Sequence, residues 1–399
     1  MKGMINFMKN KKLLALVLIV SLSTSSSILL KSNRVYAYSI SNGIQNVVRI
    51  GGTNRFDTSS KIAEHGWKQS DNVVLVGAES DVDFADALAG TPLAYSLNAP
   101  ILLTNIISTP DEISDEISKL KAKNIYILGG TGTVSQVQEN IFKSEGYAVT
   151  RIAGATRYDT AIKIADELNN KSKLSKVYLT TSSQFQYALA AATYAALENA
   201  AILFTDGDIL NQATQLEILK LDVKDVEIIG GSGIVSSDVD SELKELGLNV
   251  SRVGGNTPEE VVSNLINQNE DKINGIAIAS NSIFSDALSG AVLSAKNNMA
   301  TVFVNETFDY SNIANNITSA VIYGGTGVVS QSLEDEVKNM GDTIDISKLG
   351  DRDQAIKDDN VVMISTIDSQ DKEDKNEVYN TKEDMGVTVL SFSSNSIKN

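Results

Sequence analysis

The chain has 399 residues, of which 42% are hydrophobic, so we expect a folded globular protein. It contains no cysteine, which excludes disulfides and cysteine-ligated metal sites. A net charge of −16 argues against a nucleic acid partner, because proteins that bind nucleic acid usually carry a basic face. The single histidine, His65, excludes a histidine cluster, and its place at the end of a predicted helix favours a surface residue.

Residues 1–37 have the pattern of a secretory signal peptide. Lysines at 9, 11 and 12 precede the apolar run at 13–20, and the small-residue triplet Val-Tyr-Ala at 35–37 is a suitable cleavage site. Serines from position 21 onward interrupt the run before it reaches the ~20 apolar residues of a membrane span. We therefore expect a secreted protein with no membrane span after cleavage. Absence of cysteine suits a Gram-positive cell surface.

Removal of the signal makes the chain more acidic. Residues 1–37 contain six basic residues and no acid, so the mature chain carries −16 − 6 = −22 charges. This charge favours solubility at a surface.

Three tandem copies of one sequence unit make up most of the remaining chain. The opening RIGGTNRFDT at 49–58 returns as RIAGATRYDT at 151–160 and, more divergent, as RVGGNTPEE at 252–260. The offsets are 151 − 49 = 102 and 252 − 151 = 101 residues. Two further motifs keep the same order: a glycine-rich loop at 129–135, 230–236 and 324–330, and an (Asp/Tyr)-Ala-Leu triplet at 86–88, 187–189 and 286–288. A unit of this size can bury a small core of its own.

Strands and helices alternate within the first copy. Short continuous apolar runs bounded by polar residues predict buried strands, and apolar residues at helical spacing predict the helices between them. The expected strands are 47–50, 72–76, 100–103 and 125–128, and the expected helices are 58–67, 85–97, 111–120 and one that Ser135 caps. This alternation predicts an α/β fold of parallel sheets covered by helices on both faces. The strand at 148–152 opens the second copy without a linker, so we expect the modules to pack directly together.

The predicted organisation has five parts. They are a signal peptide at 1–37, repeats at 46–147, 148–248 and 249–346, and an acidic tail at 347–399. Residues 343–346 have the pattern of a further opening strand. The tail contains a charged stretch at 368–375 and weak echoes of a repeat at 350–356 and 360–364, which indicate a decayed fourth copy or a partly disordered segment.

The glycine-rich loops follow a strand and precede a helix, a position where backbone N–H groups can bind phosphate. The first loop departs from the dinucleotide fingerprint, because Ser135 stands where the last glycine should be. The loop also occurs three times, which no single cofactor site requires. We interpret it as a tight turn and predict no cofactor.

The openings supply candidate anion-binding groups. Arg55 and Arg157 each lie two residues before an acid, Asp57 or Asp159. A local or inter-repeat ion pair that holds the loop is the structural interpretation, which we favour, and a guanidinium fork for phosphate or carboxylate is the functional one. The third copy has Pro258 at this position, so a site built on the arginine would be damaged there.

The first residue of the (Asp/Tyr)-Ala-Leu triplet differs among the three copies, which excludes a catalytic role for it that all copies share. Asp86 and Asp286 are candidate bases in a cleft at the carboxyl edge of a sheet, but the second copy has Tyr187 there. We predict no enzyme, no catalytic residues and no metal site. An enzyme whose catalytic set is confined to one repeat stays open as an alternative.

These motifs together resemble the type 2 cell-wall-binding repeat family of clostridial surface proteins. The resemblance rests on the R-x-(G/A)-G-x-x-R-(F/Y)-D-T opening, the (D/Y)-A-L triplet, an Ile-Leu-Leu strand and the I-(L/I)-G-G-(T/S)-G-x-V-S loop. It covers residues 46–346 and is weakest in the third copy. It implies three Rossmann- or Toprim-like modules in a pseudo-threefold arrangement.

The resemblance also implies a function. Members attach non-covalently to the cell wall by binding an anionic, teichoic-acid-like polysaccharide, and the Ile-Leu-Leu strand is tied to this binding. The third copy departs from that motif, with Thr301, Val302 and Phe303. The implied polymer-binding residues are Ile101, Leu102, Leu103, Ile202 and Leu203, with Arg49, Arg55, Arg151 and Arg157 as local positive groups. Weak single sites would combine by avidity.

We therefore expect a secreted, non-catalytic protein of the cell wall or surface layer. Its expected partner is an anionic wall polysaccharide, and other surface-layer proteins are a further class of partner that the resemblance leaves open. An adhesin displayed by the same anchor, with the tail as its contact segment, is the second alternative.

Overall fold

The computed structural model describes residue 44, residues 46–79, 87–305 and 317–339, and the backbone of two strands in the tail. The chain divides into a unit of Ser41–Ile344 and a second unit of Met1–Ile40 with Asp345–Asn399. In the second unit, β13 (Ile364–Ile367) and β14 (Leu390–Ser393) pair in parallel. The predicted signal peptide, the strand at 343–346 and the rest of the tail lie outside the described residues.

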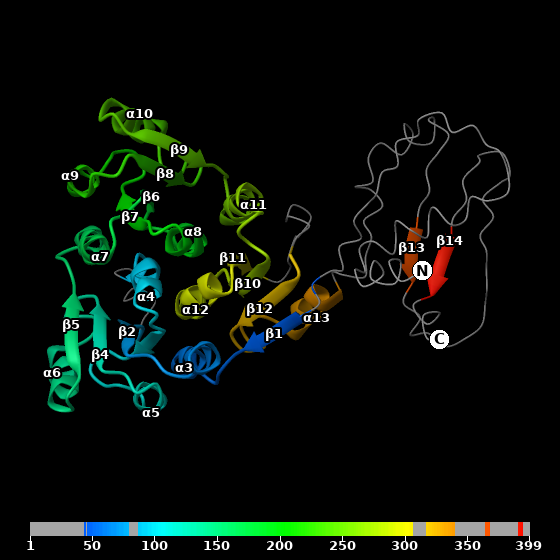
Figure 1. Ribbon diagram of the computed structural model, residues 1–399, viewed down its shortest axis with the longest axis horizontal. Coiled ribbons are helices and arrows are strands. Elements are labelled where there is room, and N and C mark those ends of the chain that lie inside the picture. The colour runs from blue at the N-terminus through cyan, green and yellow to red at the C-terminus, as the bar shows by residue number, and fades with distance from the viewer. Residues whose placement is uncertain are drawn as a thin grey trace, which may run out of the picture. The chain divides into compact units, whose positions relative to one another are not determined.

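The unit Ser41–Ile344 contains three α/β modules (Figure 1). Module 1 consists of α3 (Arg55–Gly66), β2 (Asn72–Gly77), α4 (Thr91–Ser96), β3 (Ile101–Thr104), α5 (Asp111–Lys119), β4 (Asn124–Leu128), α6 (Gln136–Ser144) and β5 (Ala148–Ile152). Module 2 consists of α7 (Arg157–Lys171), β6 (Lys176–Thr181), α8 (Phe185–Leu197), β7 (Ala201–Thr205), α9 (Gln212–Leu221), β8 (Asp225–Ile229), α10 (Ser237–Glu245) and β9 (Asn249–Val253). Module 3 consists of α11 (Pro258–Gln268), β10 (Gly275–Ser280), α12 (Phe284–Lys296), β11 (Met299–Val304), β12 (Ser319–Tyr323), α13 (Gln331–Asn339) and β1 (Asn46–Ile50).

Each module has one parallel four-stranded sheet, which confirms the predicted fold class. The strand orders are β3-β2-β4-β5, β7-β6-β8-β9 and β11-β10-β12-β1. Several strands are almost wholly apolar and buried; β2, for example, has four consecutive residues, 73–76, without exposed surface. In the described residues helices separate most of the consecutive strands, because a parallel pair needs a crossover connection.

The sheets are out of step with the sequence repeats by one strand. The opening strand of the second repeat, β5, pairs with β4 and so completes the sheet of module 1. The opening strand of the third repeat, β9, likewise completes the sheet of module 2. The first opening strand, β1, pairs in the same register with β12, at the far end of the sequence unit. Strand β1, the first of the described strands, therefore closes the ring of modules.

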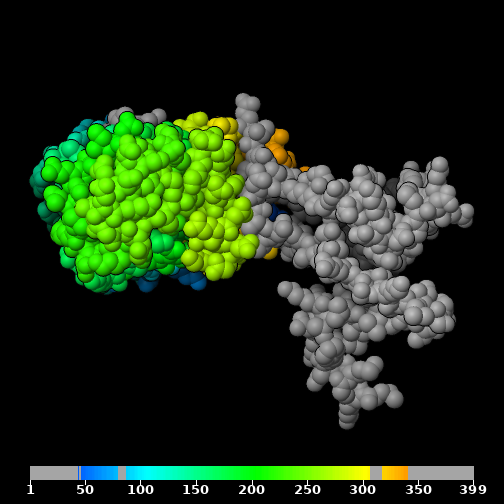
Figure 2. Space-filling model, turned by 90° about the horizontal axis from the view of Figure 1, so that it is seen from above, coloured from blue at the N-terminus to red at the C-terminus, as the bar shows by residue number. Residues whose placement is uncertain are grey.

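Helices connect neighbouring modules in one cyclic pattern. The second helix of each module packs against the first helix of the next, as α4 on α7, α8 on α11 and α12 on α3. The three second helices also pack against one another about the pseudo-threefold axis. Figure 2 shows modules 2 and 3 forming one continuous surface, in agreement with the expected direct packing.

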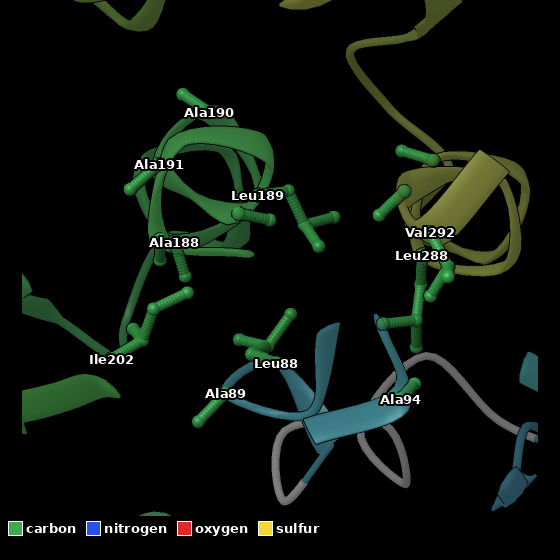
Figure 3. Close-up of a cluster of buried hydrophobic side chains, with 14 of the residues drawn as sticks. Leu88, Ala89, Ala94, Ala188, Leu189, Ala190, Ala191, Ile202, Leu288 and Val292 are labelled. Atoms are coloured by element: carbon green, nitrogen blue, oxygen red, sulfur yellow. The ribbon is translucent and has the colours of Figure 1, made fainter. Parts of the chain in front are cut away.

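Leucines of the (Asp/Tyr)-Ala-Leu triplets meet on this axis. Leu88, Leu189 and Leu288 have at most 1% of their surface exposed and face one another in Figure 3. Around them, α8 is rich in alanine, which lets neighbouring helices approach closely. The leucine of the triplet is thus a core residue shared by all three modules.

One predicted element is shorter than expected. The sequence pattern predicts a helix over 85–97, but α4 begins at Thr91. The reason is Pro92, which lies at the position of Thr193 in α8 and Val292 in α12. Proline cannot donate the N–H of a helix interior but is accepted in the first turn, so the helix begins at Thr91.

The role of β1 in closing the ring can be tested at Ile50, the buried residue at the end of this strand. Ile50 is 6% exposed, whereas Val48 in the same strand is 43% exposed. We expect Ile50→Ala to lower the free energy of unfolding by about 2–4 kcal/mol. The control Val48→Ala should change it by less than about 0.5 kcal/mol. Equal, small effects in urea denaturation would contradict a structural role for β1.

Candidate functional site

The arginine that begins each repeat clamps the glycine-rich loop of the neighbouring strand. Arg151, on β5, donates from Nη1 to the Gly129 carbonyl at 2.9 Å and from Nε to Glu139 Oε2 at 2.7 Å. Its Nη2 reaches the carbonyl of Ser135 at 3.5 Å. The guanidinium thus spans the loop and the first turn of α6.

The same clamp recurs at the other two openings. Arg49 donates to the Gly324 carbonyl (3.0 Å), the Ser330 carbonyl (3.3 Å) and Glu334 (2.6 Å), and Arg252 donates to the Gly230 carbonyl (2.7 Å), the Ser236 carbonyl (3.3 Å) and Asp240. Only 14–19% of each arginine side chain is exposed. Burial alone would raise the pKa of Glu139, but hydrogen bonds from Lys143 and Arg151 hold it below its usual value.

The glycine-rich loops are tight turns, as the sequence predicts. Gly129, Gly230 and Gly324 have φ angles of 117°, 118° and 108°, a conformation that side chains disfavour. Ser135 then caps α6, since its Oγ accepts the N–H of Gln138 at 3.2 Å. The side chain of Gln138 is itself held by Thr104 and by a backbone carbonyl.

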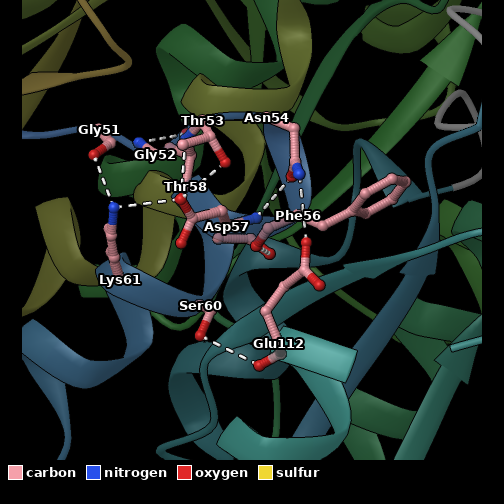
Figure 4. Close-up of polar contacts among 11 residues, drawn as sticks. Gly51, Gly52, Thr53, Asn54, Phe56, Asp57, Thr58, Ser60, Lys61 and Glu112 are labelled. Atoms are coloured by element: carbon pink, nitrogen blue, oxygen red, sulfur yellow. Dashed lines mark hydrogen bonds and ion pairs between the residues drawn. The ribbon is translucent and has the colours of Figure 1, made fainter. Parts of the chain in front are cut away.

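The acid of each opening holds the loop through the backbone. Asp57 accepts the Thr53 N–H at 2.7 Å and pairs with Lys61 at 3.1 Å, as Figure 4 shows. The backbone hydrogen bond from Thr53 is the main reason that the pKa of Asp57 is lowered. In the second repeat, Asp159 and Thr156 form a reciprocal capping box.

This arrangement corrects the local form of the expected ion pair at the openings, and leaves the inter-repeat form open. Within the described part of the chain, Asp57 does not pair with Arg55, and Asp159 does not pair with Arg157. The acid instead accepts a backbone N–H of the loop that leads into the helix, that of Thr53 or of the N-cap Thr156. The arginines point instead toward the carboxyl ends of the central strands.

The three opening positions differ in their surroundings. Arg55 donates to the Ala78 carbonyl at 2.9 Å, and its guanidinium lies 5.9 Å from the ring centre of Phe284, on α12 of module 3. Arg157 donates to the equivalent carbonyl, that of Ser182, at 3.0 Å. The third position is Pro258, which has no donor.

Module 3 satisfies the equivalent carbonyl in another way. Gln186, on α8 of module 2, donates to the carbonyl and to the side chain of Asn281, both at 3.0 Å. A side chain from the neighbouring module thus replaces the missing arginine. The junction between modules 2 and 3 has a different polar link from the junction between modules 3 and 1.

Asp286 is one of the acids that the sequence indicates as candidate bases, and it is buried at a module junction. It is 4% exposed in the first turn of α12, and burial raises its pKa to about 6 although the positive charge of Arg55 opposes the shift. In the equivalent position Tyr187 is 1% exposed. Asp86 lies outside the described residues.

The Ile-Leu-Leu strands are core elements. Ile101, Leu102 and Leu103 form most of β3, Ile202 and Leu203 lie in β7, and each is at most 1% exposed. Their side chains contact other protein side chains rather than solvent. The structure brings them together with the first helix of each module, since α3 packs on β3 and α7 on β7. Polymer binding by these residues stays a prediction.

A polar cluster in module 2 is not evident from the sequence. The Tyr158 hydroxyl donates to Asp206 Oδ1 at 2.6 Å, next to Arg157 and the Ser182 hydroxyl. Burial and the Asp206 carboxylate raise the pKa of Tyr158. Tyr158 and Asp206 are 48 residues apart, so only the rule that ligands bind at the carboxyl ends of parallel strands indicates this pairing.

Other features of the described residues are simple. His65 is exposed in the last turn of α3, as expected, and borders a shallow depression with Lys61 and Glu64. No group of three potential acidic or histidine metal ligands occurs in the described part of the chain. None of the described helices is both long enough and apolar enough to cross a membrane.

Comparison with known proteins decides the family. Residues 49–139, 151–240 and 252–334 each match cell wall binding domain 2. The chain belongs to the cell wall binding domain 2 family. The three matched ranges correspond to the three sequence repeats.

Several curated proteins are similar to this chain in sequence. The N-acetylmuramoyl-L-alanine amidase LytC of Bacillus subtilis is 31% identical over 315 residues, which cover 77% of this chain and 62% of that protein. The amidase enhancer of the same organism is 34% identical over 259 residues, which cover 65% of this chain and 34% of that protein. The chain therefore matches only part of the length of these relatives.

Solved structures show the same architecture. Cwp6 from Clostridium difficile superposes with a TM-score of 0.69 at 25% identity, covering 79% of this chain and 50% of that chain. Cwp8 from the same organism gives a TM-score of 0.64 at 26% identity, covering 74% of this chain and 52% of that chain.

The clamp geometry predicts that Arg151 stabilises the fold. Arg151→Ala removes one of the two cations that pair with the buried Glu139, together with the donor to the Gly129 carbonyl, so we expect a loss of about 2 kcal/mol in the free energy of unfolding. The control is Lys123→Ala, which breaks a surface pair with Asp71 and should cost less than about 1 kcal/mol. Similar losses for both variants in urea titrations would argue against the clamp.

Burial of Asp286 predicts a pH-dependent stability. Because its folded-state pKa is raised, it contributes most stability below about pH 4, and this contribution is lost as the pH rises through about 6. We expect Asp286→Asn to be more stable than the parent at pH 7 by on the order of 2 kcal/mol. The difference should vanish near pH 4 in thermal melts. A variant less stable at pH 7 would contradict the expectation.

Proposed function

We propose that this protein attaches non-covalently to the cell wall by binding an anionic, teichoic-acid-like polysaccharide through its repeats. The observation that carries the proposal is the presence of three cell wall binding domain 2 repeats, joined in one closed ring of modules. Two Clostridium difficile chains with related sequences share this arrangement.

Charge limits how such a ligand can be bound. The whole chain carries −16 charges, and −22 once residues 1–37 are removed, so an anionic polymer is repelled at long range. Binding therefore has to use short-range contacts to positive groups. Modest affinity at each module can still give firm attachment, because a polymer presents many identical units to linked sites.

We propose that the attachment is not accompanied by catalysis. The triplet position holds Asp86, Tyr187 and Asp286 in the three repeats, so no acid is common to all of them. Asp286 is also buried at a junction. We infer that the similarity to the amidase LytC, which covers 62% of that protein, lies in binding repeats, and this inference supports a binding role here.

We propose that the protein is secreted and resides in the wall or surface layer. The signal pattern at 1–37 supports export. Other surface-layer proteins remain a proposed second class of partner.

The test compares two wall preparations. Mature protein, residues 38–399, is incubated with purified walls and with matched walls from which mild acid has removed the anionic polymer. We expect binding to intact walls only, weakened by salt because charges are screened. Equal binding to both preparations would overturn the proposal and indicate peptidoglycan or protein as the target.

A further inference from the structure

We infer that module 2 carries the main recognition site for the polymer, at a cluster of Arg157, Tyr158, Ser182 and Asp206 that we call the module 2 edge cluster. It would bind a phosphate-bearing sugar unit. This inference rests on the proposed function and specifies which of the three related modules makes the charged contact.

Arg157 has the donor capacity for an external anion. It is exposed, and among the described residues it makes one hydrogen bond, to the Ser182 carbonyl at 3.0 Å. A guanidinium has five N–H donors in a planar fork. The bond to Ser182 fixes the position of the side chain and leaves donors for a bidentate contact with phosphate.

The residues equivalent to Arg157 in modules 1 and 3 do not offer an exposed guanidinium. Arg55 is partly buried, lies against Phe284 and is close enough to Asp286 to affect its pKa. Module 3 has Pro258, which carries no charge. Of the three opening positions, that of module 2 therefore holds the exposed arginine.

The neighbours of Arg157 suit a sugar. Asp206 is exposed, and its Oδ1 accepts the Tyr158 hydroxyl at 2.6 Å, which leaves the other carboxylate oxygen for ligand hydroxyls. The Tyr158 ring is half-buried and offers an apolar surface beside these polar groups. Ser182 is 7% exposed, and its side chain is close enough to the Tyr158 hydroxyl to lower the pKa of that group.

This combination selects against a simple anion. The Asp206 carboxylate repels a free phosphate that lies between it and the arginine. A sugar phosphate can place its charge on Arg157 and its neutral hydroxyl groups on Asp206. The cluster is thus suited to a ligand whose charge and hydroxyls are separated in space.

The cluster is particular to module 2. Tyr158 is replaced by Phe56 in module 1 and by Glu259 in module 3, so neither has the phenol hydroxyl. Asp206 is replaced by Asn105 and Asn305. These substitutions remove the tyrosine–carboxylate pair from both other modules.

Its place in the fold is the usual one for a ligand site. Ser182 directly follows β6 and Asp206 directly follows β7, two adjacent parallel strands. Arg157 and Tyr158 begin α7 at the same edge of the sheet. Ligands of open α/β sheets bind outside the carboxyl ends of the strands.

The test uses mature chains carrying Arg157→Ala, Arg157→Lys or the control Lys173→Ala. Lys173 follows the other end of α7 and is 70% exposed, so the control removes the same charge from the same module. We expect Arg157→Ala to bind intact walls about tenfold more weakly at low salt. Arg157→Lys, which keeps the charge but loses the fork, should be about threefold weaker. The control should bind like the parent.

Thermal melts of each variant show whether it is folded at the assay temperature. Polymer released by mild acid should compete far better than inorganic phosphate at equal phosphate concentration. Equal competition would overturn the sugar contact. If Arg157→Ala and Arg157→Lys bind intact walls as the parent does, while stripped walls bind none of them, the cluster is wrong but the proposed function stands. If the parent binds both wall types equally, the proposed function itself fails.

Discussion

Completion of each sheet by a strand from the next repeat is the constraint on which the rest of the structure depends. Strand β5 adds to β4 and β9 to β8, so neighbouring repeats share a sheet. In the last module β1 takes this place beside β12. The clamp arginines reinforce the same contact, since each lies on the added strand and bonds to the glycine-rich loop of the sheet that it joins. A break in any one of these contacts would expose a sheet edge.

The repeats have diverged most at the polar links between modules. Between modules 3 and 1, the positive charge of Arg55 acts on the buried Asp286. Between modules 2 and 3, both partners differ together: Pro258 replaces the arginine and Tyr187 replaces the acid. Loss of the arginine alone would leave a buried acid without its opposing charge, which is costly, whereas the paired change is tolerated. The hydrogen bond from Gln186 to Asn281 then satisfies the carbonyl that would otherwise lack its donor.

Much of the fold could be predicted from the sequence, because it depends on local apolar patterns repeated three times. Strands such as β2 and the turn at Gly129 follow from continuous apolar runs and from glycine before a helix cap. The sequence could not give the strand order, because pairing of β1 with β12 joins residues more than 250 positions apart. It also could not show that Arg55 is partly buried whereas Arg157 is exposed. Their sequence motifs are alike, and the difference comes from the neighbouring module, which places Phe284 against Arg55. The short α4 was predictable in principle from Pro92.

The repeated motif residues are mostly engaged within the protein. The triplet leucines fill the axis, the Ile-Leu-Leu residues are buried in strands, and Arg49 and Arg151 clamp loops. Residues shared by all repeats therefore explain why the chain folds as a ring more directly than they explain recognition. Recognition of a particular polymer needs exposed side chains at the carboxyl ends of the strands, and these are the positions at which the three modules differ. A repeat family can in this way keep one architecture while the exposed positions at each sheet edge determine the ligand.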